Sequence, residues 1–276
     1  MIIYLNGKFI DSKKAHISPF DEGYLFGKGL FETLRSVNGG LPFLNLHIDR
    51  LNNSLRFFGI KINESKAAFH SILKHLLKAN RLTEAYIRIT VSSGADNKPT
   101  VLIYVKKLPE IPKKYLTNGI SVMISQASRT KGSITSGHKT ISYLENITER
   151  ESALKTGYVN ALILDCSGEY AVECASANIF AVKNNAVLTP DLSSFPILPG
   201  ITRQVVIKLA KELELKTIER KILFIELVDA DEVFITGSLN GIIPVNRIGK
   251  YKIGKPGKIT ALIANQYIKK AINLVK

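Results

Sequence analysis

The chain has 276 residues, of which 45% are hydrophobic and 22% are charged. This composition is that of an ordinary globular protein, and it excludes a disordered chain, a collagen-like fibre and a coiled coil. No apolar run approaches the roughly 18 to 20 residues that a membrane-spanning helix needs, and the N-terminus lacks the basic start of a signal peptide. Cys166 and Cys174 are too few for a disulfide framework and do not match the spacing of zinc ligands. We therefore expect a cytoplasmic protein with no membrane partner and no metal site.

The charge of the chain is strongly basic. Lys and Arg together number 38 and Asp and Glu number 23, which gives a net charge of +15. Such an excess would suit a nucleic-acid-binding protein, because cations that neutralise phosphates release counterions. The basic residues are scattered, however, as in Lys106-Lys107 and Lys269-Lys270, and no tract interleaves them with stacking aromatic residues. We expect no nucleic-acid partner; the charge belongs to a solvated surface or attracts a small anionic substrate.

The first part of the chain predicts a small α+β domain over residues 1–112. It begins with a hairpin over residues 3–10 that turns at Asn6-Gly7. Apolar residues then recur every three or four positions over residues 44–58 and 64–79, which predicts two helices. Three further strands are expected, at residues 30–37, 85–91 and 100–105.

The stretch 108–114 contains two prolines that cannot continue a regular element, so we expect a larger second domain over residues 113–276. Within it, Ser142 and the glutamate three residues later, Glu145, predict a capping box for a helix. The other elements expected are a polar loop at 128–137, the body of that helix to 155, a helix that starts after Pro199-Gly200 and runs through residue 213, and strands at 119–125, 159–164, 171–172, 179–182, 186–188 and 232–236.

Two residues at the ends of expected elements carry reactive groups. Lys139 follows the polar loop, and a lysine amine forms Schiff bases when it is deprotonated, although an isolated lysine is usually a solvated cation. Glu173 precedes a run of small residues, 174–178, that lets a bulky ligand approach the backbone. A carboxylate there could hold the protonated ring nitrogen of a pyridine cofactor, or could simply be a glutamate in water.

Three further features suit an anion. The stretch 198–203 opens a helix, whose first N–H groups and dipole bind phosphate, and Thr202 adds a hydroxyl. The loop 236–241 has two hydroxyls and two glycines, which can form an anion-binding nest or an ordinary turn. Arg50 follows Ile48 of the apolar helix stripe by two residues, so we expect it to point away from that stripe, toward a phosphate or toward solvent. Together these residues are what a pyridoxal-phosphate site requires.

Six stretches of the chain form a specific set, and in their order and spacing they cover nearly all of it. They are Phe26–Arg35, His47–Leu51, His138–Asn146, Glu173–Phe180, Leu198–Arg203 and Asp231–Val245. With them the chain resembles the fold-type IV pyridoxal-phosphate enzymes, which comprise branched-chain aminotransferases, D-amino-acid aminotransferases and aminodeoxychorismate lyases. The resemblance implies an α+β fold, with a small α+β domain, a larger, mostly β domain and the cofactor pyridoxal 5'-phosphate between them.

The resemblance also implies a role for particular residues. Lys139 matches the catalytic lysine that forms the Schiff base with the cofactor, and Glu173 matches the partner of its pyridine nitrogen. The other implied cofactor-binding residues are Arg50, Ile201, Thr202 and Ser238 at the phosphate, Tyr143 beside the ring, and Ser176 and Asn178. The expected substrate-binding residues are Phe26, Thr33 and Arg88, of which Arg88 would hold a carboxylate. Many members have a glycine where this chain has Cys174.

Differences at single positions indicate which of the three kinds of enzyme in this family the chain resembles most. Branched-chain enzymes tend to have a glycine where Thr33 stands and Gly-Thr-Ala where residues 237–239 stand, and both differences resemble the lyase, as does the stretch 17–21. Typical D-amino-acid enzymes have an arginine at the place of Ser93, whereas Tyr86-Ile87-Arg88 resembles branched-chain enzymes. We expect a homodimeric lyase of folate biosynthesis that converts 4-amino-4-deoxychorismate to p-aminobenzoate and pyruvate. The alternative is an aminotransferase, a transferase acting on branched-chain L- or D-amino acids.

Overall fold

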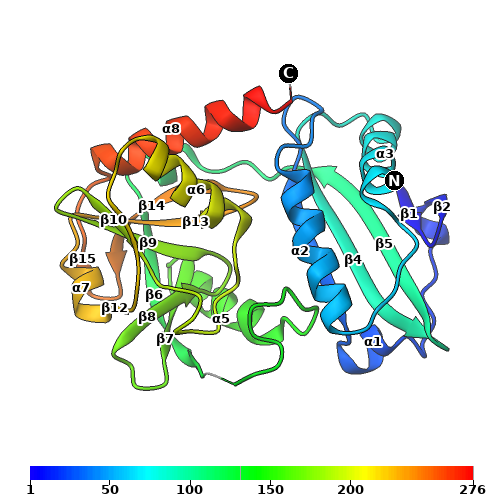
Figure 1. Ribbon diagram of the computed structural model, residues 1–276, viewed down its shortest axis with the longest axis horizontal. Coiled ribbons are helices and arrows are strands. Elements are labelled where there is room, and N and C mark those ends of the chain that lie inside the picture. The colour runs from blue at the N-terminus through cyan, green and yellow to red at the C-terminus, as the bar shows by residue number, and fades with distance from the viewer. Residues whose placement is uncertain (131, 276) are drawn as a thin grey trace. The chain divides into compact units, whose positions relative to one another are not determined.

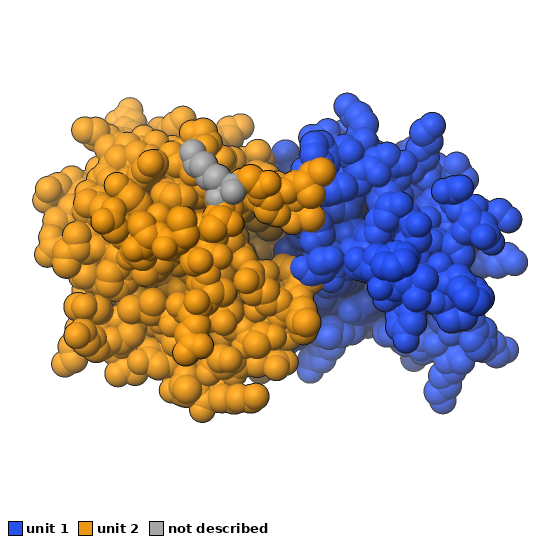
Figure 2. Space-filling view, turned by 90° about the horizontal axis from the view of Figure 1, so that it is seen from below, with its two compact units in different colours: residues 1–109, 138–142, 270–276 blue, residues 110–137, 143–269 orange. Residues whose placement is uncertain are grey.

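The computed structural model describes residues 1–130 and 132–275, so Lys131 of the expected polar loop lies outside the described residues. The chain divides into two compact units (Figure 2). Unit 1 comprises Met1–Pro109, His138–Ser142 and the chain from Lys270 onward, and unit 2 comprises the remainder. The units are therefore not two continuous stretches, as the expected domains 1–112 and 113–276 are, because two short segments return to unit 1.

Unit 1 contains an antiparallel sheet of five strands. The strands are β1 (Ile2–Leu5), β2 (Lys8–Asp11), β3 (Gly29–Arg35), β4 (Ala85–Ala95) and β5 (Lys98–Lys107), in the order β2-β1-β5-β4-β3. The expected hairpin is confirmed, and its turn residues Asn6 and Gly7 have φ angles of 47° and 86°. Positive φ at both positions is what a two-residue hairpin turn requires, and Asn-Gly adopts it readily.

Two helices cover one face of this sheet, α2 (Leu44–Phe57) and α3 (Lys66–Ala79) (Figure 1). Their apolar stripes pack on alternate strand residues to form the core of unit 1, so both helix predictions are confirmed. Leu73 and Leu76 of α3 and Ile87 and Ile89 of β4 are completely buried there. Shorter helical turns, which the sequence analysis did not anticipate, occur at Ser12–Lys14 and at α1 (Glu22–Phe26).

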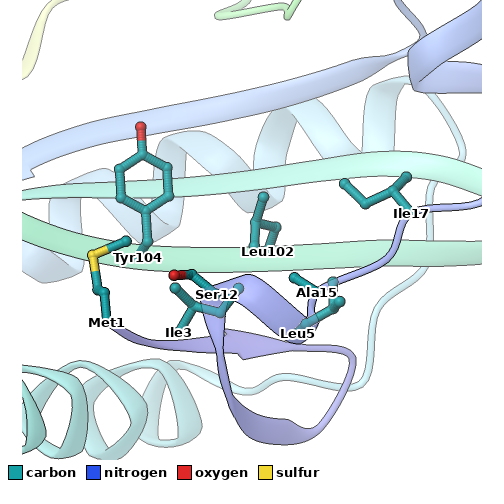
Figure 3. A pocket seen from close by; sticks show the side chains of 8 residues that line it. All are labelled: Met1, Ile3, Leu5, Ser12, Ala15, Ile17, Leu102 and Tyr104. Carbon is teal, nitrogen blue, oxygen red and sulfur yellow. The ribbon is translucent and has the colours of Figure 1, made fainter.

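The other face of the sheet carries two cavities. An apolar cavity of about 230 Å³ lies over β1 and β5, where Leu102 and Tyr104 project from β5 beside Ile3 and Leu5 (Figure 3). It is lined by Met1, Ile3, Leu5, Ser12, Ala15, Ile17, Leu102 and Tyr104. A second cavity, of about 470 Å³, shares Ile17 and Leu102 with the first and extends toward Ile141. This face of unit 1 is thus hollowed, and Gly23 and Tyr24 of the short helix α1 line the second cavity.

Unit 2 is built on a mixed sheet in the order β11-β10-β9-β13-β14-β6-β7-β8-β12, with β15 paired to β14. Parallel pairs join β6 to β7 and to β14, and β10 to β11. The strands are β6 (Ile120–Arg129), β7 (Asn160–Asp165), β8 (Tyr170–Cys174), β9 (Asn178–Lys183), β10 (Ala186–Thr189), β11 (Thr217–Glu219), β12 (Ile222–Leu223), β13 (Glu232–Gly237), β14 (Gly241–Ile248) and β15 (Tyr251–Lys252).

The helices of unit 2 are α4 (Lys113–Thr117), α5 (Leu144–Lys155), α6 (Ile201–Glu212), α7 (Phe224–Val228) and α8 (Lys258–Asn273), whose last turn belongs to unit 1. The predicted capping box of α5 is wrong. Tyr143, not Ser142, precedes the helix, and the Ser142 hydroxyl donates instead to the carbonyl of Gly27. Glu145 is drawn away from a capping position because it pairs with Arg129. No helix among the described residues is long and apolar enough to cross a membrane.

Two glycines with similar backbone conformations, one of them beside the turn between β4 and β5, have very different surroundings. Gly94 and Gly59 have nearly equal φ angles, +71° and +69°. A Cβ atom on Gly94 would lie 1.7 Å from the carbonyl oxygen of Lys98, whereas a Cβ atom on Gly59 would meet nothing within 4 Å. We expect Gly59→Ala to lower the free energy of unfolding by about 1 kcal/mol through its φ angle alone. Gly94→Ala should cost several times more, because strand backbone must move, and equal losses in urea unfolding would contradict this.

Candidate functional site

Lys139 lies on a short segment that extends the sheet of unit 1. The N–H of Phe31 donates to the carbonyl of Lys139 at 2.8 Å, and the N–H of Ile141 donates to the carbonyl of Gly29 at 3.0 Å. The segment is thereby paired with the outer edge of β3. His138 anchors its start, since the ring nitrogen Nδ1 lies 2.9 Å from the Ser54 hydroxyl of α2. These contacts fix the backbone that carries the lysine.

The Lys139 side chain lies beside other predicted site residues of unit 1. Its Nζ is 4.5 Å from the centre of the Phe31 ring, and the Arg88 guanidinium is 3.7 Å from the centre of the same ring. Thr33 stands opposite Arg88 in the β3–β4 register. Arg88 is held by donating from Nε to the Thr90 hydroxyl at 3.1 Å. Both side chains therefore lie against one aromatic ring, whose negative face attracts positive charge.

Arg50 is not directed to solvent, because it pairs with the buried carboxylate of Glu32 on β3. Its Nε donates to Oε1 of Glu32 at 2.7 Å, and its Nη2 donates to Oε2 at 2.7 Å. His47 Nδ1 lies 2.7 Å from the same Oε2. The Arg50 side chain is only 10% exposed and that of Glu32 only 1%. Glu32 and His47, which were not among the residues expected at the site, thus account for the position of Arg50.

These groups shift one another's ionisation. Burial raises the pKa of Glu32, but the electrostatic effects of Arg50 and His47 and the hydrogen bonds that both make outweigh burial and hold this pKa at about 2. Burial and the nearby positive charges of Arg50 and Lys139 lower the pKa of His47, and together they outweigh the Glu32 carboxylate, which raises it. At neutral pH the histidine is thus uncharged, and since an ionised Glu32 can only accept hydrogen bonds, His47 donates its Nδ1–H.

In unit 2, Glu173 lies near the end of β8 and is 8% exposed. Its Oε1 is 3.7 Å from Nε of Arg129, and its Oε2 accepts from the N–H of Leu198 at 3.3 Å. Arg129 also pairs with Glu145 and donates to Oδ1 of Asn146 at 3.2 Å. The guanidinium of Arg129, a residue that the sequence analysis missed, therefore joins Glu173 to the first turn of α5.

The small residues after Glu173 receive side chains from two other elements. The hydroxyl of Tyr143 donates to the Ala175 carbonyl at 3.1 Å, and Nδ2 of Asn146 donates to the same carbonyl at 2.7 Å. Nδ2 of Asn160 donates to the Ser176 hydroxyl at 3.0 Å. Cys174, where many family members have glycine, is buried in the core, and burial raises the pKa of its thiol. The side chain by which this chain differs from those family members at residue 174 therefore lies in the core.

The predicted anion-binding residues of unit 2 lie near one another at the start of β9. A Cβ atom on Gly200, the residue before α6, would lie 2.0 Å from Oδ1 of Asn178, and one on Gly237 would lie 3.8 Å from the carbonyl of Ser176. The start of α6, with Ile201 and Thr202, and the loop containing Ser238 therefore both adjoin β9. Ile201 and Thr202 are buried, and the hydroxyl of Thr202 lies 3.4 Å from that of Tyr267.

Phe26 is the predicted site residue that unit 1 does not bring together with the others. It ends α1, and its side chain is 73% exposed. The described part of the chain also contains no group of three or more His, Cys, Asp or Glu residues placed to hold a metal ion.

Comparison with known proteins identifies the family. A family model described as amino-transferase class IV matches residues 29–248. The chain belongs to the class IV aminotransferases. It is 35% identical to a Methanocaldococcus jannaschii protein assigned to the branched-chain-amino-acid aminotransferases, over 97% of this chain and 95% of that protein. It is also 31% identical to the aminodeoxychorismate lyase of Bacillus subtilis, over 99% and 96% of the two chains.

Solved structures agree with this assignment. The Escherichia coli branched-chain aminotransferase superposes with a TM-score of 0.92 at 27% identity, over 100% of this chain and 96% of that one. Enzymes of this family use pyridoxal phosphate, so the expected cofactor and the fold-type IV α+β class are confirmed. These relatives include both an aminotransferase and a lyase.

The residues of unit 2 fit a phosphate group. Among the described side chains none caps the N-terminus of α6, so its first N–H groups are available to an anion. The buried hydroxyl of Thr236, one residue before Gly237, has no hydrogen-bond partner in the described chain. A buried hydroxyl of this kind is normally satisfied, and a bound anion or water at the loop would do so.

The carboxylate of Glu32 should make stability depend on acid pH. Its pKa in the folded protein, about 2, lies below the ordinary value of 4.5, so it stabilises the fold at neutral pH. This contribution, roughly 3 kcal/mol, is lost as the pH falls from about 4.5 toward 2. In urea unfolding, wild type should exceed Glu32→Gln in stability at pH 7, and the difference should shrink by pH 3.

The matched control is Glu151→Gln on the exposed side of α5, which makes the same chemical change in water. It should alter stability by less than about 0.5 kcal/mol at every pH. A difference between wild type and Glu32→Gln that stays constant from pH 7 to pH 3 would contradict the assigned ionisation.

Proposed function

We propose that this enzyme is a pyridoxal-phosphate-dependent lyase that converts 4-amino-4-deoxychorismate to p-aminobenzoate and pyruvate. The observation that carries the proposal is the polar, cationic strand surface beside Lys139. Arg88 and Lys139 share the ring of Phe31, and Thr33 stands opposite Arg88. A guanidinium and a hydroxyl suit a substrate with two carboxylates, whereas an aliphatic side chain there would desolvate both groups without pairing them.

Each cofactor-binding residue has a proposed role. Lys139 would hold the aldehyde group of the cofactor, and the Glu173 carboxylate would accept a hydrogen bond from the pyridine nitrogen and so favour its protonated form. Arg50, Ile201, Thr202 and Ser238 bind the phosphate, and Tyr143, Ser176 and Asn178 adjoin the ring. The cofactor, when bound, supplies the electron sink for the negative charge that develops on the substrate.

The side chains of the chain then handle the substrate and the protons. Arg88 binds a substrate carboxylate and so orients the ring over Lys139. The neutral amine of Lys139 takes the proton from the carbon that bears the amino group, and the resulting ammonium gives a proton to the methylene carbon of the departing enolpyruvyl group. The C–O bond breaks, that group leaves as pyruvate, and formation of the aromatic ring drives the step.

A second candidate is an aminotransferase acting on branched-chain L- or D-amino acids with the same cofactor residues. It is favoured by the 35% identity to the M. jannaschii protein and by the Tyr86-Ile87-Arg88 stretch. The two reactions differ in the fate of the substrate after proton removal, since an aminotransferase reprotonates it at the cofactor and a lyase expels a leaving group.

The substrate assay separates the two candidates. We expect the purified holoenzyme to release p-aminobenzoate, followed by its fluorescence, from freshly made 4-amino-4-deoxychorismate. L-leucine, L-valine and D-alanine, each with a 2-oxo acid acceptor, should give no comparable turnover. Silence with aminodeoxychorismate and rapid amino transfer from any of these amino acids would establish the second candidate instead.

Lys139 should be indispensable for either reaction. Lys139→Ala should lower the turnover number by at least about a thousandfold, because it removes the proton-transferring amine. Lys155→Ala, at the exposed end of α5, should leave it unchanged. A Lys139→Ala protein with a near-normal rate would refute the assignment of the lysine.

Arg88 should act on the carboxylate-bearing substrate. Arg88→Gln should lower kcat/KM for aminodeoxychorismate by roughly 10- to 100-fold, the effect of losing a charge-assisted hydrogen bond. Arg247→Gln is the matched control, since Arg247 also lies over an aromatic ring, 5.3 Å from that of Tyr158, but in unit 2. An equal loss in both variants would argue against a substrate contact at Arg88.

We further propose a cytoplasmic homodimer acting in folate biosynthesis. The dimer is supported by the strong exposure of the aromatic side chains Phe20, Tyr24 and Phe26 in and just before α1, which are 73–77% exposed. Sedimentation should give twice the chain mass, and Phe20→Asp should weaken association. A wild-type protein that sediments as a monomer at micromolar concentration would refute the dimer.

A further inference from the structure

Glu32, His47 and Arg50 form a closed group in the interior of unit 1. The two oxygens of Glu32 accept three hydrogen bonds of 2.7 Å each, two from Arg50 and one from His47. Glu32 and His47 are 1% and 2% exposed. The group joins β3 to α2 within the apolar core that Leu30 and Leu34 form on the same strand face.

Stability alone does not account for this group. Taking a carboxylate and a guanidinium out of water costs several kcal/mol each, and an apolar residue of similar volume often stabilises a fold at least as well. Since Leu30 and Leu34 flank Glu32 on one face, an apolar side chain would suit its position. The carboxylate therefore has a use that an apolar residue could not supply.

The geometry of the guanidinium indicates that use. Arg50 binds Glu32 through Nε and Nη2, which form one edge of the planar group. This side-on pairing fixes the plane and directs Nη1 away from Glu32. His47 donates to Oε2, so it restrains the rotation of the carboxylate about its own axis. The three side chains thus determine the direction of the opposite edge of the guanidinium.

We propose that Glu32 and His47 are positioning residues that orient Arg50 for the phosphate group of the cofactor. This inference rests on the proposed role of Arg50 in phosphate binding. Glu32 neutralises the buried guanidinium when no phosphate is bound, and its acceptor atoms keep the arginine in one rotamer. The entropy of ordering this long side chain is therefore lost on folding rather than on binding.

The test compares pyridoxal 5'-phosphate with pyridoxal, which lacks the phosphate. Dissociation constants of both are measured by absorbance titration of the apoenzyme, and the quantity of interest is their ratio. Glu32→Gln should lower the preference for the phosphorylated form by about 10-fold, equivalent to one charge-assisted hydrogen bond. The affinity for pyridoxal should change little. A loss of affinity for both ligands alike would mean a merely structural role and would overturn the proposal.

His47 supplies a second, independent pair of variants. His47→Ala removes the donor and should lower the same ratio, whereas His47→Asn keeps an N–H near the position of Nδ1 and should restore most of it. Because these variants leave the Arg50–Glu32 pair intact, they test the proposal even if Glu32→Gln does not fold. Equal ratios for His47→Ala, His47→Asn and wild type would overturn the role of His47.

Two controls separate this inference from the function on which it rests. Glu84→Gln breaks a half-buried ion pair with Arg35 in the same unit and should leave the ratio unchanged. Arg50→Gln should lower the ratio at least as much as Glu32→Gln. If Arg50→Gln leaves the ratio unchanged, the proposed phosphate contact itself is wrong. If only Arg50→Gln lowers it, the phosphate contact stands and the positioning role of Glu32 and His47 is wrong.

Discussion

The backbone pairing between β3 and the segment His138–Ser142 is the constraint on which the rest of unit 1 depends. Two hydrogen bonds, from Phe31 and Ile141, hold a lysine against a strand that is far from it in sequence. Strand alternation then assigns opposite tasks to neighbouring residues, because successive side chains point to opposite faces. Phe31 faces the Lys139 amine, and Glu32 faces the helices. One short strand thus contacts both the Lys139 amine and the arginine of α2.

Charge is handled differently in the two units. In unit 1 the carboxylate of Glu32 is buried among apolar residues and is matched by a fixed arginine and a neutral histidine, so it remains ionised despite burial. In unit 2 the guanidinium of Arg129 lies between two carboxylates, Glu145 and Glu173, at the start of a helix. Both arrangements hold a side chain in place through ionic partners on a second element. The positions of these polar side chains are therefore fixed by ionic partners that lie on other helices or strands.

The elements that could be predicted from the sequence are those determined by residues close together in the chain. The Asn6-Gly7 hairpin and helices α2, α3 and α6 follow from turn chemistry and apolar periodicity, and the structure has them within about two residues. The capping box failed because Glu145 has a stronger ionic partner outside its helix. Arg50 was placed by periodicity alone, which could not reveal a carboxylate on another element. A signal did exist: Glu32 stands between two leucines of one strand face, where charge is rarely unpaired. The sequence of helix α8 also contains a signal of its structure, since Ile263, Tyr267 and Ala271 are buried at intervals of four residues.

The segment that carries Lys139 also closes an edge of a sheet. Without it, β3 would be a seven-residue terminal strand with a row of unpaired N–H and carbonyl groups, the kind of template on which other chains add and aggregate. The opposite edge is β2, which has only four residues and begins with an exposed lysine. The segment His138–Ser142 thus protects the adjoining part of β3 from intermolecular pairing. Changes that loosen it would be expected to cost solubility.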